Sequence, residues 1–186
     1  MVQERNSPGA AGVEMVTEST MLGLLLRAFL FDRSVYRELM DRPLASFAGL
    51  GIVVLVGIAF ATGLAGKDTL DLGGSRVLTA IWRANFIVFG WVLWSWESIL
   101  IGRYALGGVA NVQQMLRSLG FALSPGILFF FASIPIAGDY FFIAVLIWIL
   151  VTGSMAVKET LGFNWWKGIV TGAFGWLLVY PIMLNV

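Results

Sequence analysis

Long apolar runs, separated by short polar segments, occupy most of the chain from residue 44 onward. Each run is close to the roughly 20 residues that a helix needs to cross a hydrocarbon core about 30 Å thick. The pattern predicts five membrane-spanning helices, over about residues 44–65, 81–101, 119–137, 140–157 and 168–184. Only Gly138 and Asp139 separate the third span from the fourth, which predicts a tight antiparallel hairpin.

The segment ahead of the first span has two parts. Residues 1–19 are polar, small and aperiodic, and we expect a flexible cytoplasmic tail. Thr20 is a candidate helix N-cap, and Asp32 and Ser34 give a second helix-start signal. Within residues 20–43, the apolar face consists of Leu22, Leu25, Leu26 and Phe29, with arginines interleaved. This pattern is typical of an amphipathic helix in the membrane interface, the alternative being a cytoplasmic helix packed on the inner ends of the spans.

Composition agrees with a membrane location. Of the 186 residues, 59% are hydrophobic and 12% are charged, against about 25% charged residues in an ordinary soluble domain. A water-soluble surface with so few charges would expose large apolar patches and aggregate. We therefore expect an all-α, polytopic membrane protein, in which the transmembrane domain of residues 44–186 follows the tail and the amphipathic helix.

The distribution of Lys and Arg predicts the orientation of the chain. With the N-terminus in the cytoplasm, nine of the twelve basic residues fall in inner segments and three in outer ones. The nine are Arg5, Arg27, Arg33, Arg37, Arg42, Arg103, Arg117, Lys158 and Lys167, and the three are Lys67, Arg76 and Arg83. Because cytoplasmic loops carry the excess of basic residues, we expect the N-terminus inside and the C-terminus outside the inner (cytoplasmic) membrane of the cell.

The residues that most enzymes use are scarce. The chain has neither cysteine nor histidine, which removes disulfides, thiolate chemistry and imidazole bases or ligands. It has no phosphate-binding or dinucleotide-binding glycine loop, and no aspartate pair lies within the predicted spans. We therefore expect a protein that is not an enzyme and has no catalytic residue, cofactor or metal. The net charge of +1 gives no reason to expect a nucleic-acid partner.

Glu97 is the acidic residue that falls inside a predicted span. A charged carboxylate in hydrocarbon is costly, so such a residue is either paired or functional. Since Glu97 lies about one turn from the inner interface, an ion pair with Arg103 or Arg117 is the leading interpretation. An ion or proton path and a contact with a partner subunit are the alternatives.

Two further groups of residues are candidates for contacts. Gly168 and Gly172 form a G-x-x-x-G pair, which lets two helices approach closely, either within the chain or between subunits. Candidates for contact with the lipid interface are Arg27, Arg33, Arg37, Arg42, Trp165 and Trp166. Arginine attracts anionic headgroups, and tryptophan prefers the level of the headgroups.

Three stretches resemble the bacterial branch of the Yip domain family, the Ypt/Rab-interacting proteins. They are LLLRAFLFDRSVYRELMDRP, IGRYALGGVANVQQMLRSLGFALSPGILFFF and WILVTGSMAVKETLGFNWWKGIVTGAFGWLL, within residues 24–180. The resemblance implies a five-span membrane fold without an assigned activity. Eukaryotic members are associated with Rab-type GTPases, but their acidic-tyrosine-glycine motif is not found ahead of the first span, so a GTPase partner is not carried over.

These features favour a non-catalytic membrane scaffold or accessory protein that acts by helix packing and insertion into the interface. Its expected partners are the lipid bilayer and other membrane-protein subunits or a second copy of the chain. One alternative is a transporter or channel for a small solute or ion, with Glu97 in its path. Another is an accessory subunit of a larger respiratory or photosynthetic complex.

Overall fold

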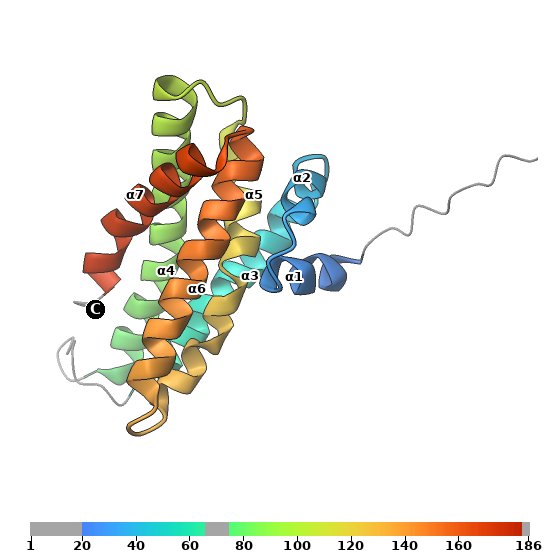
Figure 1. The fold of residues 1–186 in the computed structure, drawn as a ribbon. Coiled ribbons are helices and arrows are strands. Elements are labelled where there is room, and N and C mark those ends of the chain that lie inside the picture. Colours follow the sequence, from blue (N-terminus) through green and yellow to red (C-terminus); the bar gives the residue numbers. More distant parts are fainter. Residues whose placement is uncertain (1–19, 66–74, 184–186) are drawn as a thin grey trace, which may run out of the picture.

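The computed structural model describes residues 20–65 and 75–183, and these residues form helices and turns without any strand. The predicted tail of residues 1–19 lies outside the described residues. The helices are α1 (Met21–Phe29), α2 (Ser34–Met40), α3 (Ala45–Gly63), α4 (Arg76–Ile99), α5 (Val112–Ala122), α6 (Gly138–Leu161) and α7 (Trp165–Met183), and Figure 1 shows their arrangement. A π-helical segment η1 (Leu100–Ala105) continues α4, and a 3₁₀ helix η2 (Ser124–Ser133) follows α5.

Three of these helices are long and apolar enough to cross a membrane. They are α3 with 19 residues, α4 together with η1 with 30 residues, and α6 with 24 residues. The pair α5 and η2, bent by 40°, makes a fourth if it is counted as one broken span. The chain is thus an all-helical protein with the apolar helices of a membrane protein, and α7 covers the run predicted as a fifth span.

The predicted third span is not a continuous helix. An Asn111–Gln114 capping box starts α5, because the side chain of each residue accepts a hydrogen bond from the backbone N–H of the other. The α-helix ends at Ala122, and Pro125, which has no N–H to donate, stands at the start of η2. The Pro125-Gly126 pair therefore marks a change of helix type and direction within the predicted span.

The segment predicted as one amphipathic helix forms two. Thr20 caps α1 as expected, since its hydroxyl accepts a hydrogen bond from the N–H of Gly23. The helix then ends at Phe29, and Phe31 adopts a left-handed conformation with φ of 64°. Asp32 accepts a hydrogen bond from the N–H of Ser34, which fixes the turn into α2. The second start signal at Asp32 and Ser34 is confirmed, and a turn divides the amphipathic segment predicted over residues 20–43 into two helices.

Close contacts between small residues hold the bundle together. In Figure 1, α6 runs through the bundle with α5 and α7 near it, and α3 packs on α4, α5 and η2. A Cβ atom added to Gly57 of α3 would come within 2.8 Å of the carbonyl oxygen of Ala84 in α4. One added to Gly120 of α5 would come within 3.0 Å of Cα of Gly49 in α3. These glycines let neighbouring backbones touch, as in membrane helix pairs.

Candidate functional site

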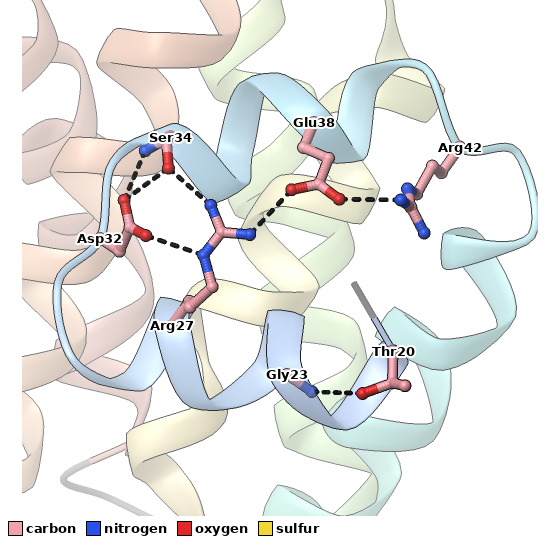
Figure 2. A network of polar contacts seen from close by, with 7 residues as sticks. All are labelled: Thr20, Gly23, Arg27, Asp32, Ser34, Glu38 and Arg42. Atoms are coloured by element: carbon pink, nitrogen blue, oxygen red, sulfur yellow. Dashed lines mark hydrogen bonds and ion pairs between the residues drawn. The ribbon is translucent and has the colours of Figure 1, made fainter. Parts of the chain in front are cut away.

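The α1–α2 hairpin carries a network of polar contacts centred on Arg27 (Figure 2). Arg27 Nε donates to Asp32 Oδ2 at 2.8 Å, Nη1 donates to Glu38 Oε2 at 2.8 Å, and Nη2 donates to Ser34 Oγ at 2.6 Å. The guanidinium thus ties the end of α1 to the turn and to α2. Glu38 Oε1 lies 2.9 Å from Arg42 Nη2, one helical turn further on.

Arg27 and Asp32 each favour the charged form of the other. Hydrogen bonds from the Ser34 hydroxyl and from Arg27 lower the pKa of Asp32 from 3.8 to about 2. Hydrogen bonds to Asp32 and Glu38 raise the pKa of Arg27. At neutral pH, two cations, Arg27 and Arg42, face two anions, Asp32 and Glu38, so the formal charges of these four residues sum to zero.

A second group of charges joins α2 to the ends of α6 and α7. Arg37 donates through Nε to Glu159 Oε2 at 2.7 Å, and Lys158 binds the other oxygen of the same carboxylate. The Glu159 side chain is 3% exposed and that of Arg37 is 69% exposed. The guanidinium of Arg33 lies 4.4 Å from the centre of the Trp165 ring, a distance typical of a cation–π contact.

The residues predicted to contact the lipid interface therefore fall into two sets. Arg27 and Arg42 belong to the neutral network, whereas Arg33 and Arg37 lie next to the start of α7 with Trp165. Trp166, the next residue of α7, is exposed. On α1, Leu24 and Ala28 are buried against the bundle, and Leu22 and Leu26 point away from it, 66% and 51% exposed.

The predicted ion pair of Glu97 with Arg103 or Arg117 does not form. Glu97 is buried, its Oε2 accepts a hydrogen bond from the hydroxyl of Ser98 at 3.5 Å, and its Oε1 has no hydrogen-bond partner. A Cβ atom at Gly175 of α7 would come within 2.2 Å of Glu97 Oε2, so the carboxyl group packs directly against that helix. The pair is absent because Glu97 points into the contact between α4 and α7, whereas Arg103 is exposed in η1.

Arg117 acts instead as a clamp between α5 and the segment that joins α2 to α3. Its Nε donates to Ser46 Oγ at 2.8 Å, and its Nη1 donates to the carbonyl oxygens of Leu39 and Met40 at 3.4 and 3.0 Å. The side chain is buried. Arg117 therefore supplies a donor to the Met40 carbonyl at the C-terminal end of α2, where an α-helix leaves carbonyl groups without helical partners, and a second donor to the Leu39 carbonyl, which also accepts from the N–H of Arg42.

Trp94 lies where α4, α6 and α7 meet. Its indole Nε1 donates to the carbonyl oxygen of Gly172 in α7 at 3.1 Å. Cβ atoms at Gly153 of α6 and at Gly175 of α7 would each come within 2.2 Å of the indole ring. Trp94 was not predicted as a site residue, because α4 holds five other aromatic residues and the glycines that face Trp94 lie on α6 and α7.

Gly168 and Gly172 pack within the chain in this structure. Cβ atoms at these positions would come within 2.5 Å of Lys158 Cβ and 2.7 Å of Ser154 Cα, both on α6. The G-x-x-x-G pair thus brings α7 against the end of α6, which was one of the two interpretations of the motif. Glu159 was not predicted as a site residue, although an acidic residue beside Lys158 at the end of an apolar run indicates an ion pair.

Replacing Arg117 with methionine is expected to loosen α2, because the variant keeps the length of the side chain and loses its donors. The Met40 carbonyl and the Ser46 hydroxyl would then lose this donor, while the Leu39 carbonyl keeps the backbone N–H of Arg42, at a cost of about 2 kcal/mol in unfolding free energy. Hydrogen–deuterium exchange should become faster in α2 and at the start of α3. Arg103→Met, which changes an exposed arginine, is the matched control, and equal exchange in both variants would contradict the clamp.

Among the described residues, the candidate site thus consists of contacts between helices and of hydrogen bonds and ion pairs that hold the α1–α2 hairpin. No three acidic side chains of these residues lie close enough together to hold a metal ion. Comparisons of the chain with protein-family models, with curated proteins and with solved structures find no match.

Proposed function

We propose that the chain is a non-catalytic membrane scaffold or accessory protein, which acts by helix packing and by inserting its α1–α2 hairpin into the bilayer. In this proposal α3, α4, the α5–η2 pair, α6 and α7 are five spans, with the N-terminus in the cytoplasm and the C-terminus outside. The resemblance to the Yip domain family and the distribution of basic residues support this topology.

The observation that carries the proposal is how polar groups are used inside the bundle. Thr152 donates to the carbonyl oxygen of Ala122 at 2.7 Å, Thr160 donates to Ser118 Oγ at 2.7 Å, and Trp91 Nε1 donates to the carbonyl oxygen of Leu116 at 3.0 Å. Each of these bonds joins α5 to α6 or α4 to α5. Polar side chains at helix crossings strengthen helix association in a membrane, which is what a scaffold requires.

The space inside the bundle argues against a path for a hydrophilic solute. Between α4, α6 and α7, a cavity of about 20 Å³ is lined by apolar and aromatic side chains, among them Ile87, Trp91, Leu146 and Trp176. That volume holds about one water molecule. Selectivity for an ion or polar solute requires a series of polar groups along a pore. The buried Glu97 next to this region nevertheless makes transport the alternative to test.

Extraction of the full chain in a mild detergent tests the scaffold proposal. We expect the 20.3 kDa chain to elute in a complex of defined stoichiometry, with other membrane proteins or with further copies of itself. Light scattering combined with size-exclusion chromatography gives the protein mass of that complex. The same measurement is made on protein that was chemically crosslinked in the membrane before extraction. A monodisperse monomer with and without crosslinking would contradict the proposal.

Flux measurements distinguish scaffold from transporter. Wild-type protein and Glu97→Gln, reconstituted in liposomes with a pH-sensitive dye inside, should both leak protons no faster than protein-free liposomes. The variant keeps the size of the side chain, so it preserves the packing against Gly175 while removing the ionisable group. Proton or cation flux in the wild type that Glu97→Gln abolishes would establish the transporter function instead.

A further inference from the structure

We propose that the α1–α2 hairpin is embedded among the acyl chains of the cytoplasmic leaflet, as a wedge that occupies one leaflet, rather than lying on the membrane surface. This inference rests on the proposed function, because it takes α6 as a span whose Leu161 end faces the cytoplasm. The exposed apolar face of α1 then contacts the acyl chains of the lipid.

The depth of the hairpin follows from its contact with Trp148. Trp148 is the eleventh of the 24 residues of α6, so it lies about 15 Å from the Gly138 end and about 20 Å from the Leu161 end. Its indole Nε1 donates to the carbonyl oxygen of Phe29 at 3.3 Å, and its ring stacks on Phe31 with centroids 5.5 Å apart. The turn between α1 and α2 thus touches α6 near its middle.

The other end of the hairpin reaches the cytoplasmic end of α6. Arg37 of α2 binds Glu159, eleven residues and about 16 Å beyond Trp148 along α6. Figure 1 shows the same arrangement, with α1 beside the middle of the bundle and α2 nearer the end where α6 leads into α7. A hydrocarbon core about 30 Å thick has leaflets of about 15 Å, so the hairpin spans the depth of one leaflet.

The charges of the hairpin are arranged for this environment. A single charge within hydrocarbon is costly, but the four charges of Arg27, Asp32, Glu38 and Arg42 cancel, and all three nitrogens of the Arg27 guanidinium donate hydrogen bonds. Arg33, which stands next to this network, extends its guanidinium to Trp165 at the start of α7. Long cationic side chains within a membrane extend in this direction, because the charged group then reaches the membrane surface.

The surface that α1 turns away from the bundle is apolar, whereas the exposed residues of α2 and of its C-cap are Ser34, Arg37 and Asp41. On α1 and the turn that follows, the exposed large hydrophobic side chains are Met21, Leu22, Leu26, Leu30 and Phe31, with exposed fractions from 37% to 69%, and Arg33 is the exposed charged residue. Acyl chains are the occupant that suits such a surface at that depth, because neither water nor headgroups reach the middle of a span. Two helices added on the cytoplasmic side make the described part of the molecule wider in that leaflet.

The absence of cysteine from the chain allows a direct test in the full-length protein. Single cysteines are introduced as Leu26→Cys and Leu30→Cys, with Ile147→Cys on the exposed side of α6 and Val109→Cys in the loop before α5 as references. Inside-out membrane vesicles are treated with a membrane-impermeant maleimide, and labelling is normalised to that in denaturing detergent. We expect Leu26→Cys and Leu30→Cys to react at least about tenfold more slowly than Val109→Cys, because a thiol in hydrocarbon stays protonated and out of reach of the reagent.

The references separate the ways in which the inference can fail. If Ile147→Cys reacts slowly, the labelling rates of the hairpin cysteines decide the outcome. If the logarithm of their rate is closer to that of Val109→Cys than to that of Ile147→Cys, the hairpin lies at the surface and the wedge is excluded. If Ile147→Cys also reacts as fast as Val109→Cys, α6 is not a span and the proposed function itself is overturned. If Leu26→Cys or Leu30→Cys does not elute like the wild type in size-exclusion chromatography, Leu22→Cys replaces it as the probe of the hairpin.

Discussion

Replacing Gly63 with alanine is expected to destabilise the bundle more than the same replacement at any other glycine of α3. A Cβ atom at this position would lie 1.9 Å from the carbonyl oxygen and 2.8 Å from the carbonyl carbon of Phe129 in η2. Both atoms belong to the backbone, so no side-chain rotation relieves the contact, and α3 and η2 must move apart. Overpacking of this kind costs about 3 kcal/mol of unfolding free energy.

Gly51→Ala is the matched control on the same helix. No atom lies within 4 Å of a Cβ at Gly51, and the residue is exposed. Because alanine has the higher helix propensity, this variant should be neutral or more stable by up to about 1 kcal/mol. Steric trapping in bicelles gives the unfolding free energy of both variants. Equal stability of Gly63→Ala and Gly51→Ala would mean that α3 and η2 are not in contact at Gly63.

The helices of the bundle were predictable because their signals are local. An apolar run of sufficient length is stable as a helix whatever it packs on, and the runs predicted over residues 44–65, 140–157 and 168–184 coincide with α3, α6 and α7. A tight turn was predicted at Gly138-Asp139 for the same reason, but the structure places the turn at residues 134–137 and begins α6 at Gly138. A Cβ there would lie 2.1 Å from the carbonyl oxygen of Ala132, so the short connection needs glycine.

The partners of charged residues were not predictable in the same way. Arg117 and Ser46 are 71 positions apart, and their contact depends on which face of α5 meets the start of α3. Helical periodicity does not determine that face when nearly all sides of the neighbouring helices are apolar. The pairing of Glu97 with Arg117 was wrong for this reason, since nearness to the same end of the bundle does not place two side chains on facing surfaces.

The α1–α2 hairpin was predictable in part. The start signals at Thr20 and at Asp32-Ser34 were legible in the sequence, and both contribute to the structure through hydrogen bonds to backbone N–H groups. The bond from Arg27 to Glu38 joins residues eleven positions apart, which is too far for one helix turn and requires the chain to reverse. The acidic residues among the arginines were therefore a sign of internal pairing.

Trp94→Ala is the second substitution expected to have a large effect. The indole fills the junction of α4, α6 and α7, where it packs on Gly153 and Gly175 and donates a hydrogen bond to the carbonyl oxygen of Gly172. Its removal leaves a cavity bordered by Gly153 and Gly175 that joins the apolar cavity between α4, α6 and α7, which Trp94 lines. Loss of a buried tryptophan costs about 3–5 kcal/mol. Trp94→Phe keeps most of the ring and loses the hydrogen bond, so a smaller loss of about 1 kcal/mol or somewhat more is expected.

Trp96→Ala provides the comparison for this prediction, because Trp96 lies two residues along the same helix and is 51% exposed. Its loss removes area that faces away from the bundle and leaves no cavity. The midpoint temperature at which each variant ceases to elute as a folded species after heating should therefore fall in the order Trp96→Ala, Trp94→Phe, Trp94→Ala. If Trp96→Ala is as damaging as Trp94→Ala, the face of α4 that meets α6 and α7 is the opposite of the one described. The contact of Glu97 with Gly175 would then be lost as well, because Glu97 shares the buried face of α4 with Trp94.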